Sequence, residues 1–205
     1  MPILTSQEYD ISYFDGQKTT YQHNAGYSYY DRWYRIDGEK SLGEFWKDYT
    51  NKLKNIYDFQ NKKVLEIGCA KGFIVEDLVD MGVDAYGLDI SSYAISTAIN
   101  SAILRRPDLI TRFIVGDARI ILSNYSTKQF DVIFTCRFLE CIDDMDLIQL
   151  INEMNRISKK QIHIIDEQPN SDFYNVKTLK TWKNLNFTQG TIFISNENQQ
   201  KVLIK

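Results

Sequence analysis

Residues 64–72 read Val-Leu-Glu-Ile-Gly-Cys-Ala-Lys-Gly, and residues 86–89 read Tyr-Gly-Leu-Asp. The apolar run over residues 63–67 is bounded by polar residues and Gly68, which is typical of a buried parallel strand. Gly68 and Gly72 have no Cβ, so the backbone can turn sharply after this strand and pass close to a ligand. This stretch therefore predicts a strand followed by a ligand-binding turn.

A helix and a second strand are expected next. Apolar residues recur with helical spacing after the turn, and Gly82 is placed to end that helix. The strand over residues 83–88 then brings Asp89 to the same carboxyl edge of the sheet as the Gly68 turn. A carboxylate there can accept hydrogen bonds from two ribose hydroxyls, so the segment predicts half of a nucleoside-binding site.

The spacing of the turn separates two kinds of nucleoside site. A dehydrogenase turn needs glycine at its first, third and sixth positions, which here are Gly68, Ala70 and Phe73. The segment instead resembles the (Asp/Glu)-x-Gly-x-Gly-x-Gly turn of class I S-adenosylmethionine-dependent methyltransferases, as Glu66-x-Gly68-x-Ala70-x-Gly72. Ala70 departs from this pattern. The resemblance is closest to the type-11-like members that methylate small molecules.

Further matches to this family follow in order over residues 62–167. Residues 113–118, Phe-Ile-Val-Gly-Asp-Ala, resemble its third strand, whose acid lies beside the adenine amino group. Residues 130–135 resemble its fourth strand, and residues 138–144 resemble the Val-Leu-Glu-His-Ile-x-Asp stretch after it. Residues 161–166 supply a fifth strand.

The C-terminal part predicts a helix over residues 172–185 and a hairpin formed by residues 191–195 and 202–204. With the resemblance, this predicts an α/β Rossmann-like class I methyltransferase fold. Its seven-stranded sheet is mostly parallel, ends in an antiparallel hairpin and carries helices on both faces.

The resemblance implies that S-adenosyl-L-methionine is the methyl donor and S-adenosyl-L-homocysteine the product. The positions that correspond to cofactor contacts of the family are Glu66, Gly68, Cys69, Gly72, Asp89, Ile90, Asp117, Ala118 and Thr135. We expect the substitution Asp89→Ala to weaken cofactor binding and to leave the fold intact. Gly68→Val is expected to have a larger effect than Asp89→Ala, because the valine side chain intrudes on the turn.

Residues 1–60 are unusually aromatic and contain nine of the thirteen tyrosines. Residues 41–57 have the spacing of an amphipathic helix. We interpret residues 1–60 as a cap that belongs to the same domain as the cofactor-binding core, residues 61–205. Core packing explains many of these aromatic side chains, but the family resemblance predicts an acceptor pocket that includes Tyr13, Tyr21 and Trp33. Arg137 in the core fits either an anionic acceptor in this pocket or a structural ion pair.

Few side chains are candidates for a catalytic base. Cys141 stands where many related enzymes carry histidine, and the remaining candidates are His23, Glu140 and Asp166. His163 lies within a strand, where a hydrogen-bonded structural histidine is the better interpretation. A base is optional, because the sulfonium methyl is already activated and the protein mainly aligns the acceptor with it.

Composition argues against several partners. The net charge is −3, and the arginines at 105, 106, 112 and 119 fit a solvated face. Thr135-Cys136 stands in place of the Asn-Pro-Pro motif of base-methylating enzymes. No nucleic-acid partner is therefore expected. Three cysteines without paired spacing predict free thiols and no metal site. No run approaches the ~20 apolar residues of a membrane span. We expect a cytoplasmic protein that is a monomer or a homodimer.

The favoured hypothesis is an S-adenosylmethionine-dependent methyltransferase that transfers methyl in line to an oxygen or nitrogen of a small-molecule acceptor. Two alternatives stay open. One is a protein that binds the cofactor without transferring methyl, as a partner subunit or with other chemistry, and the other is a methyltransferase that acts on proteins or peptides. The identity of the acceptor does not follow from the fold.

Overall fold

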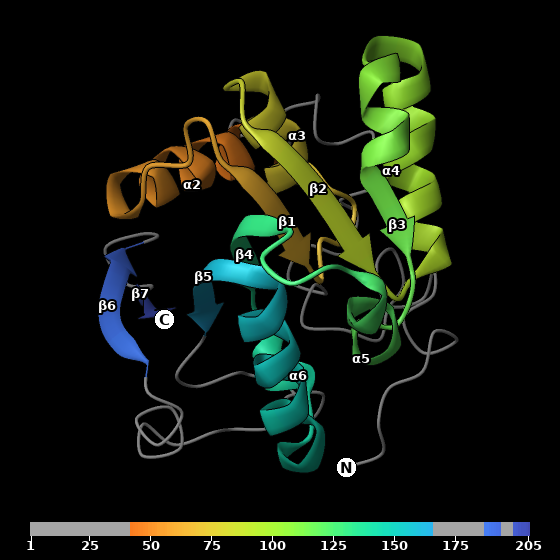
Figure 1. Ribbon diagram of the computed structural model, residues 1–205. Coiled ribbons are helices and arrows are strands. Elements are labelled where there is room, and N and C mark those ends of the chain that lie inside the picture. Colours follow the sequence, from red (N-terminus) through yellow and green to blue (C-terminus); the bar gives the residue numbers. More distant parts are fainter. Residues whose placement is uncertain (1–41, 166–186, 194–198) are drawn as a thin grey trace, which may run out of the picture.

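The computed structural model describes residues 42–165, 187–193 and 199–205. Its centre is a seven-stranded sheet with the strand order β3-β2-β1-β4-β5-β7-β6 (Figure 1). The strands are β1 (Lys63–Ile67), β2 (Asp84–Asp89), β3 (Phe113–Val115), β4 (Phe130–Cys136), β5 (Ser158–Ile165), β6 (Thr188–Phe193) and β7 (Gln199–Ile204). The predicted seven-stranded α/β fold is confirmed.

The direction of the strands changes at β7. Strands β1 to β5 pair in parallel, whereas β7 pairs antiparallel with both β5 and β6. The predicted hairpin at the end of the sheet is therefore confirmed, although its connection over residues 194–198 lies outside the described residues. The helix predicted over residues 172–185 also lies outside them.

The sheet carries helices on both faces. They are α2 (Leu42–Ile56), α3 (Phe73–Asp80), α4 (Ser92–Arg105), α5 (Ala118–Ile121) and α6 (Asp144–Ile157), with short 3-10 turns η3 (Pro107–Arg112), η4 (Leu122–Asn124) and η5 (Leu139–Cys141). The predicted helix over residues 41–57 corresponds to α2. No helix in the described segments is long and apolar enough to cross a lipid bilayer.

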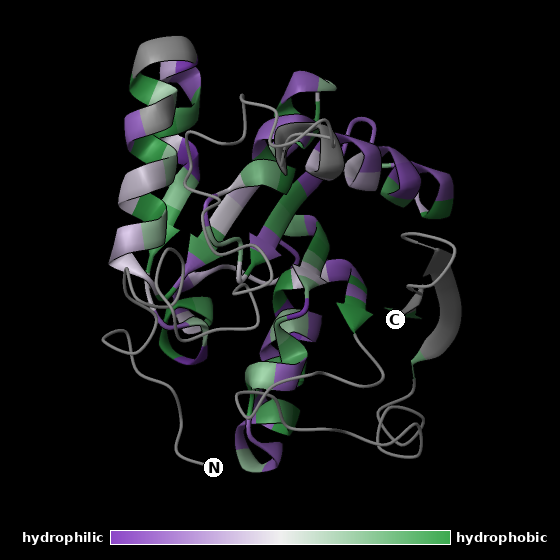
Figure 2. Ribbon diagram, turned by 180° about the vertical axis from the view of Figure 1, so that it is seen from behind, coloured by the Kyte–Doolittle hydropathy of each residue, from purple (hydrophilic) through white to green (hydrophobic). Residues whose placement is uncertain are grey.

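Two hydrophobic cores lie on opposite faces of the sheet because successive strand residues point to opposite sides. Val64 packs in the core beneath α2, α3 and α4, while the next residue, Leu65, packs in the core beneath α5 and α6. Both side chains are fully buried. Figure 2 shows hydrophobic residues concentrated along the strands. A strand that is buried on both faces has the continuous apolar sequence from which β1 was predicted.

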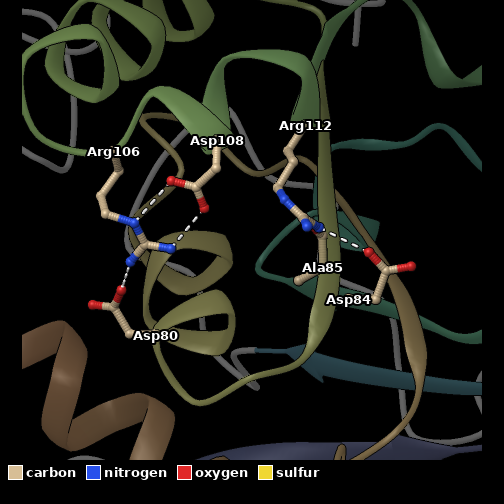
Figure 3. Close-up of polar contacts among 6 residues, drawn as sticks. All are labelled: Asp80, Asp84, Ala85, Arg106, Asp108 and Arg112. Carbon is tan, nitrogen blue, oxygen red and sulfur yellow. Dashed lines mark hydrogen bonds and ion pairs between the residues drawn. The ribbon is translucent and has the colours of Figure 1, made fainter.

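Two surface arginines join elements far from the carboxyl edge of the sheet (Figure 3). Arg106 binds Asp80 at the end of α3 and Asp108 in η3. Arg112 binds Asp84 and the carbonyl oxygen of Ala85, both in β2. Each of these cations thus pairs with a carboxylate from another element at the protein surface.

The carboxyl ends of the parallel strands form the edge of the sheet at which a ligand is expected to bind. β1 lies between β2 and β4, so the chain leaves β1 toward one side of the sheet and returns on the other. In sheets of this kind, ligands bind outside the carboxyl ends of the strands at such a reversal of strand order. The loops after β1, β2, β3 and β4 meet at this edge.

Candidate cofactor and acceptor site

The turn after β1 is left-handed at three positions. The backbone angle φ is +76° at Gly68, +48° at Ala70 and +74° at Gly72. The N–H of Gly68 donates to the carbonyl oxygen of Leu88 at 2.8 Å, which ties the turn to the end of β2. Ala70 adopts the left-handed conformation that its residue type rarely takes, so the turn keeps its shape without the middle glycine of the family motif.

Aromatic rings fill the space beside both glycines of this turn. A Cβ on Gly68 would lie 2.7 Å from Cδ2 of Phe138, and a Cβ on Gly72 would lie 2.4 Å from Cε1 of Phe113. The glycines are thus required by packing within the protein, whether or not a ligand approaches them. A side chain at either position has to displace a ring.

Asp89 holds two loops together at the end of β2. Its Oδ2 accepts a hydrogen bond from the main-chain N–H of Ala70 at 2.8 Å, and its Oδ1 accepts one from the N–H of Ser91 at 2.8 Å. Only 8% of the residue is exposed. Burial raises the pKa of Asp89, whereas these main-chain hydrogen bonds act to lower it. Ile90 also donates a main-chain hydrogen bond to this carboxylate, so part of its acceptor capacity remains for a ligand.

Glu66 carries an unpartnered buried oxygen. The residue is 3% exposed, and no hydrogen-bond partner lies at its Oε2 in the described part of the chain. Burial raises the pKa of Glu66 well above its usual range, and the negative charges of Asp89 and Asp77 add to this effect. A buried acceptor without a partner is costly, so this position suits a ligand that brings a cation or a hydrogen-bond donor.

Asp117 follows β3 and caps α5. Its Oδ1 accepts from the main-chain N–H of Arg119 at 2.9 Å, and the Arg119 side chain binds both carboxylate oxygens. The pKa of Asp117 lies below its usual value, because the hydrogen bonds and charge of Arg119 outweigh burial, which raises it. Asp117 is therefore an ionised acceptor at the same edge as Asp89.

Behind the end of β4 lies a buried polar network. Thr135 Oγ1 and His163 Nδ1 are 2.9 Å apart, and His163 Nε2 lies 2.9 Å from Oε1 of Gln161. Gln161 Nε2 donates in turn to Oδ1 of Asn155 in α6 at 2.6 Å. His163 is fully buried, and burial lowers its pKa to about 3. The network agrees with the interpretation of His163 as a structural histidine, and the fully buried side chain of Thr135 belongs to this network.

A tyrosine and a cysteine meet on the α2 side of β4. The hydroxyl of Tyr49 and Sγ of Cys136 are 3.3 Å apart. Burial raises the pKa of Cys136 to about 12, and the charges of Glu66, Arg137 and Glu140 also act on this thiol. Cys136 is therefore a neutral group in a partly buried cluster of charged side chains. The contact fixes α2 to the end of β4.

Arg137 and Glu140 follow Cys136 in the loop after β4. Arg137 has φ of +55°, and its N–H donates to the carbonyl oxygen of Ile164 at 2.8 Å. A positive φ in a residue other than glycine is uncommon and marks a backbone that its surroundings constrain. Glu140 lies in η5 with 3% exposure. The loop therefore presents a half-buried guanidinium at the carboxyl edge.

The structure brings together the cofactor residues that were predicted after β1, β2 and β3. Cys69 is buried, and burial raises its pKa well above the usual range, so its thiol is a packing group. Ala118 begins α5 and is also buried, and Ile90 is half-buried.

Five predicted site residues lie outside the described residues: Tyr13, Tyr21, His23, Trp33 and Asp166. The three cysteines are free thiols, and no cluster suited to a metal occurs among residues 42–165, 187–193 and 199–205.

Two residues of this edge were missed by the sequence interpretation. Tyr49 was assigned only to the predicted amphipathic helix over residues 41–57, and Arg119 to a solvated face. Their hydrogen bonds to Cys136 and Asp117 come from the tertiary fold. The Asp-x-Arg spacing was the only local signal, because an arginine two residues after an N-capping aspartate can fold back onto it.

Comparison with known proteins identifies the family. A profile described as a methyltransferase domain matches residues 58–203. The chain belongs to this methyltransferase family. It is a class I enzyme of the type that uses S-adenosylmethionine, and the residues described above fit that donor: an unpartnered acceptor at Glu66 and carboxylates at Asp89 and Asp117.

Solved structures share the fold of this methyltransferase. The PH0226 protein of Pyrococcus horikoshii superimposes with a TM-score of 0.64 at 21% identity over 87% of this chain and 98% of its own. A SAM-dependent methyltransferase of Archaeoglobus fulgidus gives 0.61 at 17% identity, over 80% and 94% of the two chains. Magnesium protoporphyrin IX methyltransferase of Synechocystis, solved with bound SAH, gives 0.59 at 15% identity, over 85% and 92%. No curated protein sequence matches the chain.

The buried histidine predicts an acid-sensitive fold. Unfolded, His163 takes up a proton as the pH falls through about 6.5, whereas in the fold it stays neutral down to a pKa of about 3. Because only the unfolded state gains the proton, we expect stability to fall by up to about 1.4 kcal/mol per pH unit between about pH 6 and pH 4 from this group. His163→Gln should flatten this part of the curve of unfolding free energy against pH.

The measurement is urea unfolding at a series of pH values for the original protein and the variant. The glutamine keeps an amide near Thr135, so the variant is expected to lose only about 1–2 kcal/mol at neutral pH. Parallel curves for the two proteins would contradict the assignment of His163 as a buried neutral group.

Proposed function

We propose that the protein transfers a methyl group from S-adenosylmethionine to an oxygen or nitrogen atom of a small-molecule acceptor. The observation that carries the proposal is the order of acceptor groups along the carboxyl edge. Asp117 lies just after β3, Asp89 is the last residue of β2 and Glu66 is the last but one of β1, so three acidic side chains follow one another from one side of the sheet to its centre. When bound, S-adenosylmethionine supplies a methyl group that its sulfonium has already activated.

Each residue of this edge has a role that matches its environment. Asp117 accepts from the adenine amino group, and Asp89 accepts from the ribose hydroxyls with the acceptor capacity that its main-chain hydrogen bonds leave. Glu66 Oε2 accepts a hydrogen bond from the ammonium group of the methyl donor. Gly68, Gly72, Ile90 and Ala118 shape the walls of this site.

The acceptor is expected beyond Glu66, at the end of β4. Adenine at β3 and ribose at β2 leave the reacting end of the donor beside β1 and β4. There Tyr49, Cys136 and Arg137 offer an aromatic hydroxyl, a neutral thiol and a guanidinium. Arg137 suits an acceptor with a carboxylate or phosphate group, because its planar fork binds such groups with two hydrogen bonds.

A neutral Cys136 with a pKa of about 12 is not a proton acceptor at neutral pH, so Glu140 remains the candidate base among the described residues. His23 and Asp166 remain candidates outside them. We also propose that residues 1–60, which include α2, cap the core formed by residues 61–205. The bond between Tyr49 and Cys136 and the stacking of Trp46 on Phe73 support this arrangement.

The test uses purified protein, S-adenosylmethionine labelled on its methyl group, and panels of carboxylate, phenol and amine acceptors. We expect label in a small-molecule product and S-adenosylhomocysteine in equal amount. The variant Asp117→Asn serves as a control with a weakened donor site. Label that appears only in protein bands would favour a protein methyltransferase, and tight cofactor binding without any labelled product would favour a cofactor-binding protein without transferase activity.

A further inference from the structure

The guanidinium of Arg119 lies between carboxylates from two different elements. Its Nε is 2.9 Å from Oδ1 and 3.0 Å from Oδ2 of Asp117, and its Nη2 also binds Oδ2. Its Nη1 donates to Oδ2 of Asp146, in the first turn of α6, at 3.0 Å. The side chains of Asp117 and Arg119 are 21% and 27% exposed, so the pair is largely shielded from water.

The number of hydrogen bonds leaves Asp117 with little free capacity. Three hydrogens of Arg119 point at its carboxylate: the main-chain N–H, the Nε–H shared between both oxygens, and one on Nη2. An ionised carboxylate has about four acceptor sites. Because the Nε–H is shared, these hydrogens make two contacts at each oxygen, so at most about one acceptor site remains, which restricts the carboxylate to a single N–H of a ligand.

The arrangement also fixes the direction of that remaining site. Two parallel hydrogen bonds from a planar guanidinium set the orientation of a carboxylate, which a single flexible donor does not. Asp146 holds the other side of the guanidinium, so α6 anchors the pair. Arg119 also acts against protonation of Asp117, and an ionised carboxylate has no hydrogen to donate.

We propose that Arg119 is a positioning residue that orients Asp117 and so makes the donor site select a 6-amino purine over a 6-oxo purine. A carboxylate held in this way accepts from the adenine amino group and repels the carbonyl oxygen of hypoxanthine. This inference rests on the proposed contact of Asp117 with adenine. Asp146 contributes by holding Arg119 in place.

The test is calorimetric titration of the full chain with S-adenosylhomocysteine and with S-inosylhomocysteine, in which a carbonyl replaces the amino group. The original protein should prefer the adenine compound by about tenfold or more. Arg119→Gln should weaken the binding of the adenine compound about tenfold and change the binding of the inosine compound less than about twofold. The preference for the adenine compound is then lost.

Two further variants separate geometry from charge. Arg119→Lys keeps the charge but lacks the fork, and it should not restore the preference. Asp146→Asn leaves the contact between Arg119 and Asp117 intact but loosens its anchor, so it should reduce the preference by about threefold. This variant also tests the inference if Arg119→Gln fails to fold.

Arg112→Gln is the matched control. Arg112 likewise pairs with an aspartate (Figure 3), but its partner Asp84 lies at the start of β2, away from the carboxyl edge. It should bind both compounds as the original protein does. An Arg119→Gln protein that keeps the preference, or binds the adenine compound more tightly, would overturn the inference.

Asp117→Asn distinguishes the inference from the proposed site. If this variant loses affinity for S-adenosylhomocysteine while Arg119→Gln does not, the adenine contact stands and the role of Arg119 is wrong. An asparagine keeps one acceptor oxygen, so Asp117→Ala is measured beside it. If Asp117→Ala binds as the original protein does, Asp117 does not contact the nucleobase, and both the proposed contact and the inference fail.

Discussion

Replacement of Gly72 by alanine is expected to destabilise the fold by about 2–5 kcal/mol and to abolish measurable cofactor binding. Two costs add at this position. The φ of +74° disfavours any L side chain, and the new Cβ would lie 2.4 and 2.6 Å from two ring atoms of Phe113. Because Phe113 is a buried residue of β3, the ring cannot move aside without disturbing the core. Thermal unfolding and titration with S-adenosylhomocysteine measure the two losses.

Gly82 supplies a matched control for the first cost. Its φ is +81°, and nothing lies within 4 Å of the position that a Cβ would take. Gly82→Ala should therefore show only the backbone penalty of about 1–2 kcal/mol and leave cofactor binding unchanged. Adding Phe113→Ala to Gly72→Ala removes the obstructing ring. This double variant tests whether the clash with the ring causes the stability loss that exceeds the backbone penalty. Equal destabilisation by the two single alanine substitutions would refute the steric argument.

The substitution Asp89→Ala is expected to cost about 2–5 kcal/mol of stability as well as cofactor affinity, because it leaves two buried N–H groups without acceptors. The sequence suggested that this change would leave the fold intact. The structure adds a cost in stability to that expectation, since the carboxylate joins the turn at Ala70 to the start of α4 at Ser91. Urea unfolding and calorimetry on the same preparation give both quantities.

Asp89→Asn is the control for this prediction. An asparagine keeps one acceptor oxygen, so it can still bind one of the two N–H groups, and about half of the stability loss should return. If the alanine variant matches the original protein in stability, Asp89 does not hold the turn. If its affinity for S-adenosylhomocysteine is also unchanged, Asp89 is not part of the cofactor site.

The central strands were predictable because each is buried on both faces. Such strands have continuous apolar sequences that end at a turn residue, and β1 was predicted with the bounds that the structure has. The third strand is shorter than predicted, since Asp117 leaves the sheet to cap α5 and Ala118 already belongs to that helix. A capping aspartate directly after a strand explains this difference.

The partners of side chains were not predictable in the same way. Arg119 reaches Asp146 in a different helix, and Tyr49 reaches Cys136 at the far end of β4. These contacts depend on how helices pack on the sheet, which local patterns do not encode. The glycines of the first turn give a further example: the sequence explains them by a ligand, whereas the structure places Phe138 and Phe113 beside them.

The strand order has a consequence for how the protein forms during synthesis. β1 pairs with β2, which follows it closely, and with β4, which emerges much later. A nascent chain that ends before Phe130 can assemble the turn and the nearby carboxylates on one side of β1 but has no strand to cover the other. Pairing over such a sequence separation closes a large loop and is slow. The part of the edge that includes Cys136 and Arg137 is thus completed after the part in which Asp89 binds the turn at Ala70.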